Sequence, residues 1–134
     1  MGSLSNYAES KILDHTFKNT AFTQPTNLYL ALLKSTPDDT HTGSDLPGEF
    51  SGDGYERKKC NTWDAAGGAG ATENSQPCEF AQATGDWGLA THFAVCDKTT
   101  LGNVIGWSVL DVSKNIQSGD QARFATGDLD VTLD

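Results

Sequence analysis

The stretch GDWGLATHFAVCD, residues 85–97, predicts a turn that leads into a buried β-strand. Glycine at 85 and 88 can adopt the positive φ angles of tight turns, and Asp86 can accept hydrogen bonds from backbone N–H groups two residues on. Side chains alternate between the two faces of a strand. One face then holds Leu89, Thr91, Phe93 and Val95, and the other holds Ala90, His92, Ala94 and Cys96. The second face is mostly small, which favours a closely packed layer over a substrate site.

The same stretch contains Asp86, His92 and Cys96, the residue types of a nucleophilic triad. In an extended strand, His92 and Cys96 lie about 13 Å apart at their Cα atoms, so their side chains cannot meet. No Gly-x-Ser-x-Gly or similar nucleophile motif is present. Free cysteine is among the most buried residue types. We therefore predict a structural histidine and buried thiols, no catalytic residue and no enzymatic activity.

An earlier stretch, NLYLALLK at residues 27–34, is apolar on both strand parities from Leu28 to Leu33. A strand of a sheet with one solvated face would alternate instead. Both faces of this strand therefore need a cover. We expect a second sheet on one face, and an N-terminal helix or a neighbouring subunit on the other.

The first segment, LSNYAESKILDHTFKN at residues 4–19, does not alternate and predicts one helix over about residues 5–18. Asn6 as N-cap with Glu9 three residues later suits a capping-box variant. The apolar positions spread over an arc wider than the roughly 100° stripe of a surface helix, so we expect the helix to contact two surfaces. The candidate assembly interface comprises Leu4, Tyr7, Ile12, Leu13 and Phe17.

Length and composition predict the fold class. The chain has 134 residues, which suits one domain, and its 14 glycines and single methionine favour turns that join strands. We predict a mainly β protein, a small antiparallel β-sandwich of about seven strands with one N-terminal α-helix. Residues 1–134 form a single domain in this prediction, with the helix at about 5–18 and the sandwich at about 27–134.

The charge and the cysteines limit the environment and partners. A formal net charge of −9 repels nucleic acid and anionic lipid, and no apolar run approaches the ~18 residues of a membrane span. No signal-peptide pattern opens the chain, so we expect a soluble protein that is not exported by a signal peptide. Cys60, Cys78 and Cys96 are odd in number and widely spaced. We therefore expect free thiols in a reducing compartment.

Two kinds of binding site remain as alternatives. The acidic loop at residues 35–54 has carboxylates that a calcium ion could use, but it lacks the Asp-x-Asp-x-Asp-Gly pattern. We expect a solvated loop, no metal and no cofactor. Tryptophans can stack on sugars, although core packing is the expected use of Trp63, Trp87 and Trp107. Trp63 and Trp87 are the candidate glycan contacts.

Five blocks of the sequence carry a resemblance to a known family. They are LSNYAESKILDHTF at 4–17, TNLYLALLKSTPDDTHTG at 26–43, GDGYERK at 52–58, ATGDWGLATHFAVCD at 83–97 and FATGDLDVTLD at 124–134. Together they resemble a family of short bacteriophage virion proteins usually described as phage tail fibre proteins. Positions that match its recurring letters are Tyr7, Asp14, His15, Tyr29, Gly54, Tyr55, Trp87, Gly88, His92, Phe93 and Gly127 to Leu129.

The resemblance implies a non-enzymatic structural protein of the virion, made in the cytoplasm of the host bacterium. We expect it on the exterior of the particle, as a tail-fibre-like or capsid-decorating (cement) subunit. Its expected partners are other copies of itself and a larger phage protein, either the major capsid protein or a tail or baseplate protein. The alternative function is a carbohydrate-binding receptor-recognition module of the tail.

Overall fold

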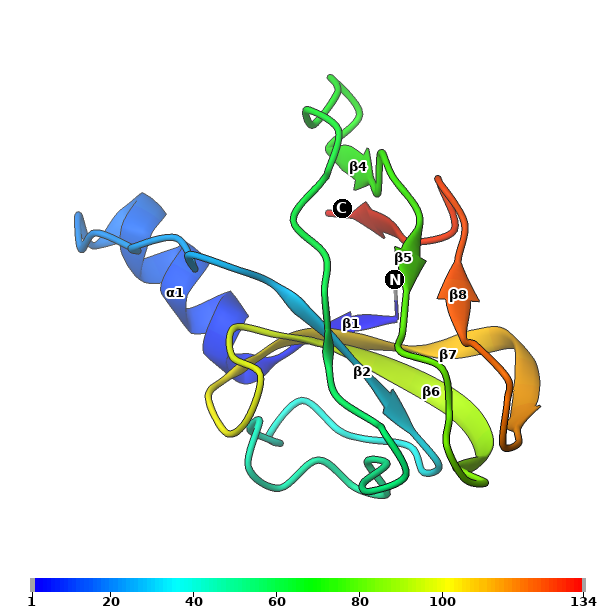
Figure 1. Ribbon diagram of the computed structural model, residues 1–134. Coiled ribbons are helices and arrows are strands. Elements are labelled where there is room, and N and C mark those ends of the chain that lie inside the picture. Colours follow the sequence, from blue (N-terminus) through cyan, green and yellow to red (C-terminus); the bar gives the residue numbers. More distant parts are fainter. Residues whose placement is uncertain (1, 134) are drawn as a thin grey trace.

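A computed structural model describes residues 2–133 and confirms a mainly β protein with one N-terminal helix (Figure 1). Nine strands lie within these residues, against about seven expected, because several consist of only two or three residues. The elements in chain order are β1 (Ser3–Leu4), α1 (Asn6–Phe17), β2 (Tyr29–Leu33), β3 (Lys58–Lys59), β4 (Ala71–Glu73), β5 (Cys78–Glu79), β6 (Gly88–Cys96), β7 (Val104–Ile116), β8 (Arg123–Phe124) and β9 (Asp130–Thr132).

All strand pairs are antiparallel and form one large and two small sheets within the described part of the chain. The large sheet has five strands in the order β1-β7-β6-β2-β3, and the small sheets are β4-β9 and β5-β8. Strand β6 is central, since it pairs with β7 on one side and with all five residues of β2 on the other. The stretch at residues 85–97 therefore supplies the middle strand of the protein.

One face of the large sheet packs against the two small sheets. Leu30 and Leu32 of β2 and Phe93 of β6 point into a core that also contains Phe80 and Leu129 from the second layer. Aromatic rings fill this core: the ring centroids of Trp87 and Tyr55 lie 5.3 Å apart in an edge-to-face arrangement. This packing gives the predicted sandwich its two layers.

The opposite face of the large sheet is covered by the acidic loop, residues 35–54. Ala31 and Leu33 of β2 pack in a second core with Leu46 of that loop and Ala94 of β6. The expectation that the helix or a neighbouring subunit covers this face is therefore wrong. The apolar residues on both faces of β2 show that each face must be covered. In the sequence, however, a single Leu46 between acidic residues and a proline gives little sign that this loop provides the cover.

The predicted alternation along β6 is wrong at its first residues. Ala90 is buried in the same core as Phe93, whereas Leu89 is 49% exposed. The register explains the change, because one residue of β6, Thr91, lies opposite four residues of β7, residues 110–113. A bulge of this kind re-aims the side chains on either side of it.

The N-cap of helix α1 lies one residue earlier than predicted. Ser5, and not Asn6, is the N-cap: its side-chain oxygen accepts a hydrogen bond from the Ala8 N–H at 3.2 Å. The Ser5 N–H donates to the Ile105 carbonyl, and the Asn6 N–H donates to the Asp39 carbonyl. The first turn of the helix is thus fixed to β7 and to the acidic loop.

Two of the three cysteines form a disulfide bond, which corrects the prediction of free thiols. Cys60 and Cys78 are bonded and lie 18 residues apart, while Cys96 is free and buried. An odd number of cysteines leaves room for one bond, and the bond depends on the close approach of β3 and β5, which the spacing does not reveal. The inferred reducing compartment loses its basis.

We predict that the Cys60–Cys78 bond stabilises the protein by about 3 kcal/mol, because it restricts a loop of the unfolded chain. A reductant should then lower the melting temperature by about 10 °C. The Cys60→Ala/Cys78→Ala variant is the control, since it should melt at the lower temperature with or without reductant. A melting temperature that reductant leaves unchanged in the native protein contradicts the prediction.

Candidate functional site

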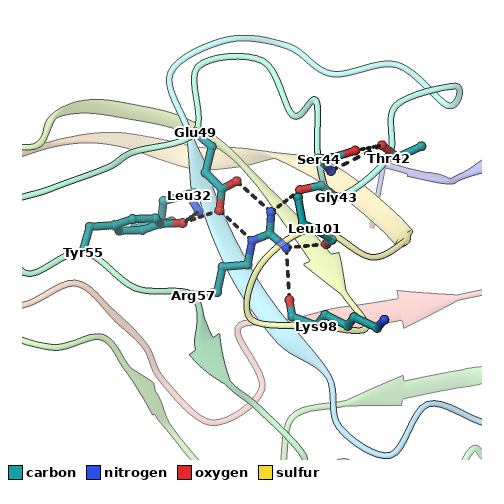
Figure 2. Close-up of polar contacts among 9 residues, drawn as sticks. All are labelled: Leu32, Thr42, Gly43, Ser44, Glu49, Tyr55, Arg57, Lys98 and Leu101. Atoms are coloured by element: carbon teal, nitrogen blue, oxygen red, sulfur yellow. Dashed lines mark hydrogen bonds and ion pairs between the residues drawn. The ribbon is translucent and has the colours of Figure 1, made fainter.

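The most polar buried cluster surrounds Arg57, just before β3 (Figure 2). Arg57 is 7% exposed, and its guanidinium binds the Glu49 carboxylate through two hydrogen bonds, Nε to Oε1 at 2.7 Å and Nη2 to Oε2 at 2.8 Å. The Tyr55 hydroxyl donates to the same Oε1 at 3.1 Å and accepts from the Leu32 N–H at 3.0 Å. The cluster thus joins the acidic loop to β2.

The remaining donors of Arg57 all bind backbone carbonyls. Nη1 donates to the Lys98 and Leu101 carbonyls at 3.0 Å each, and Nη2 donates to the Gly43 carbonyl. A guanidinium has five N–H donors, so every one of them is used. Arg57 therefore fastens the acidic loop to the hairpin between β6 and β7, and it has no donor left for a substrate.

The ionisation of this cluster follows from its burial. Burial alone lowers the pKa of Arg57, but the hydrogen bond with Glu49 and the surrounding charges outweigh it, and the net shift is upward. Burial, together with the Glu49 charge, raises the pKa of the Tyr55 hydroxyl. Arg57 stays charged and Tyr55 stays protonated, as their hydrogen bonds to Glu49 require. We call Arg57, Glu49 and Tyr55, with the backbone carbonyls that Arg57 binds, the Arg57 clamp. Sequence reasoning missed this role, because the letters YERKK resemble an edge strand.

The three residues of the possible nucleophilic triad have separate partners. Asp86 accepts from the Ser118 N–H at 2.9 Å, and His92 contacts the Thr91 and Thr36 hydroxyls at 2.8 and 3.3 Å. Burial raises the pKa of the Cys96 thiol to about 12. The structure does not join them into a catalytic arrangement.

The carboxylates of the acidic loop stabilise its own turns. Asp38 accepts from the Thr40 N–H at 2.8 Å, and Asp45 accepts from the Thr42 N–H at 2.6 Å. Hydrogen bonds from these two threonines lower the pKa of both carboxyls. Within residues 2–133, no group of three or more histidine, cysteine or acidic side chains is placed to hold a metal ion.

The tryptophans proposed as glycan contacts are engaged inside the protein. Trp87 is 4% exposed in the aromatic core, and its indole N–H donates to the Asp53 carbonyl at 2.8 Å. A ring so deeply buried cannot stack on a sugar, so this candidate is wrong. Trp63 is half-buried and donates to the Cys60 carbonyl at 2.9 Å.

Helix α1 and the segment after it form an N-terminal arm, residues 6–27, at one end of the molecule (Figure 1). The segment folds back along the helix: the Thr20 N–H donates to the Asp14 carbonyl at 3.1 Å, and Phe22 lies edge-on against Tyr7 with ring centroids 6.4 Å apart. Ala8 is the one helix residue that is fully buried within the described chain.

The five candidate assembly residues divide between two roles. Leu4 lies in β1 opposite Gly106, and Tyr7 packs against Phe22, so both are partly covered. The other three are exposed on the helix: Ile12 by 36%, Leu13 by 55% and Phe17 by 82%. Leu13 and Phe17 are four residues apart and therefore lie on the same side of the helix. We call these three residues the outer face of the arm.

A β-rich body with a saturated internal clamp and an exposed apolar helix has the construction of a binding or structural subunit. No helix in residues 2–133 is both long and apolar enough to cross a lipid bilayer. The chain matches the family model described as podophage GP4 fiber I protein gp80 over residues 3–132, and it belongs to this family of phage fibre proteins. This confirms the resemblance drawn from the sequence blocks. No curated protein matches the chain.

We predict that Arg57→Ala lowers the free energy of unfolding by about 3–5 kcal/mol, because it leaves the Glu49 charge without its buried partner. The Arg57→Ala/Glu49→Ala variant should lose less than the sum of the two single variants, since both remove one interaction. Urea unfolding measures all three. If the losses in the free energy of unfolding are additive and total less than about 1 kcal/mol, Arg57 and Glu49 do not stabilise the protein as described.

We predict that Cys96 does not react with a thiol reagent in the folded protein at pH 8. Its pKa of about 12 keeps the thiol protonated there, and the thiolate is the reactive form. Labelling with a maleimide, followed by mass spectrometry, should add one group only after unfolding in denaturant without reductant. Labelling of Cys96 at a similar rate before and after unfolding contradicts the prediction.

Proposed function

We propose that this fibre protein is a non-enzymatic structural subunit on the exterior of the virion, attached to a larger phage structural protein through the outer face of the N-terminal arm. The observation that carries the proposal is the exposure of Leu13 and Phe17 on a helix whose first turn is fixed to the body. The same face is available to other copies of the chain in the assembled fibre.

The energetics favour a docked outer face. Moving a leucine or phenylalanine side chain from water into a packed contact gains about 1.5–3 kcal/mol. Two such side chains four residues apart form one compact ridge, which suits insertion into a pocket of a partner. The Ser5 cap and the Ala8 contact hold the helix in place before the partner binds, so less ordering is needed on docking.

The family and the charge support an exterior fibre position. The family is described as a fibre protein, which favours a tail attachment over the capsid-decorating position that the sequence left open. A net charge of −9 opposes contact with packaged DNA. The burial of Trp87 removes one of the two supports of a carbohydrate-binding role.

We predict that Leu13→Asp or Phe17→Asp reduces the number of copies per purified particle by about tenfold or more, because docking would bury an unpaired carboxylate. The melting temperature of the isolated protein should stay within about 2 °C of the native value, because both side chains are exposed. Quantitative mass spectrometry of particles gives the copy number.

The matched control is Leu89→Asp, on a leucine of β6 that is exposed almost as much as Leu13, 49% against 55%. Leu89 is near the end of the sheet that lies away from α1 (Figure 1), so its variant should be incorporated normally. Native copy numbers in particles that carry Leu13→Asp or Phe17→Asp would show that the outer face is not the attachment surface.

A further inference from the structure

The strands form an almost closed ring with one sealed and one open seam. Reading around the core, β7, β6, β2 and β3 of the large sheet are followed by β5 and β8 of a small sheet. The seam between β3 and β5 is sealed by their contact and by the Cys60–Cys78 bond. The seam between β8 and β7 holds a groove of about 700 Å³.

The walls of this groove are strand edges. Residues 108–112 and 114–116 line one wall, and residues 120–124 line the other. Consecutive residues of a strand point their side chains to opposite faces. A wall made of consecutive residues therefore follows the backbone along its edge. We call this groove the β7–β8 slot.

The walls have sheet partners on one side, since β7 pairs with β6 and β8 with β5. On the outer side of β7, β1 pairs with Gly106 and Trp107 and Gly2 lies against Ser108, and within residues 2–133 no ladder continues along the outer edge of residues 109–116. On β8, the Phe80 N–H donates to the Ala122 carbonyl at 2.9 Å, so alternation turns the backbone groups of Gln121 and Arg123 away from β5. Such open edges are templates for an added strand.

The side chains around the slot indicate what that strand carries. Buried Leu32 and Phe93 and half-buried Phe124 give it an apolar floor. Its rim has four acids and two bases. Arg123 pairs with Glu79 at 3.2 Å, Asp120 and Asp128 accept hydrogen bonds from the Gln117 and Ala125 N–H groups, and Asp130 is also engaged within the chain. The residues of the rim are Asp111, Lys114, Asp120, Arg123, Asp128 and Asp130.

We propose that the β7–β8 slot binds an extended, basic segment of a partner protein, in which lysine or arginine alternates with apolar residues. The segment adds a strand to β7, places its apolar side chains on the floor and its cations along the acidic rim. A second copy of this chain is a poorer occupant, because each copy has a net charge of −9. The slot is separate from the outer face of the arm, and the inference extends beyond the attachment proposed above.

The test uses the full-length protein with its disulfide intact and a seven-residue peptide of alternating lysine and valine, blocked at both ends. We expect binding that weakens as salt is raised, with added hydrogen-exchange protection of those amides of 108–116 that point away from β6. A peptide N-methylated at every second residue keeps the charges and loses one row of backbone donors, so it should bind at least about tenfold more weakly. Replacing lysine by glutamate should abolish binding.

The variant Asp111→Lys should weaken binding of the lysine–valine peptide about fivefold. Glu56→Lys is the matched control, because it makes the same charge change at an exposed position outside the slot and should leave affinity unchanged. Equal binding of the N-methylated peptide, or equal weakening by both variants, would reduce the interaction to general attraction between charges and overturn the proposal. Self-association that protects 108–116 without peptide would also overturn it.

Discussion

The structure depends on the need to cover β2 on both faces. Leu30 and Leu32 are buried under the second layer, and Ala31 and Leu33 are buried under the acidic loop. The acidic loop contributes Leu46 to the second core and Phe50 to the first, and most of its other side chains are polar. Arg57 supplies a further, polar attachment, because its guanidinium binds Glu49 and Gly43 of the loop and the hairpin carbonyls at Lys98 and Leu101. One buried cation thereby fixes the cover of the central strands.

The elements that the sequence predicted are those with a local signal. The continuous apolar run of β2, the stretch that forms β6 and the non-alternating first segment each predict an element from neighbouring residues alone, and all three elements exist. The protein resembled a phage fibre family through blocks that include these elements, and the family model confirms it. The wide apolar arc of α1 predicts a helix that contacts two surfaces, and the structure leaves Ile12, Leu13 and Phe17 of that arc exposed.

The features that were missed depend on contacts between distant segments. The Cys60–Cys78 bond requires β3 to lie beside β5, and the Arg57 clamp joins groups up to 44 positions apart. The bulge at Thr91 is set by β7, so the alternation of β6 alone could not reveal that Ala90 and Leu89 exchange places. For Trp87, by contrast, core packing was the expected use and glycan contact the alternative, and the rings around it show that it lies in the core.

The body and the arm have different sources of stability. The body is held by two cores, a disulfide and a saturated clamp, all of which are internal to the chain. The arm has one buried helix residue, the Ser5 cap and a few contacts with the returning segment. A helix of 12 residues is marginal in water without tertiary packing. Burial of Leu13 and Phe17 against a partner, as proposed above, would add to the stability of a helix that the Ser5 cap and the Ala8 contact already hold in place. The proposed attachment surface is therefore an exposed face on a helix that is already fixed to the body, so docking does not need to order the helix first.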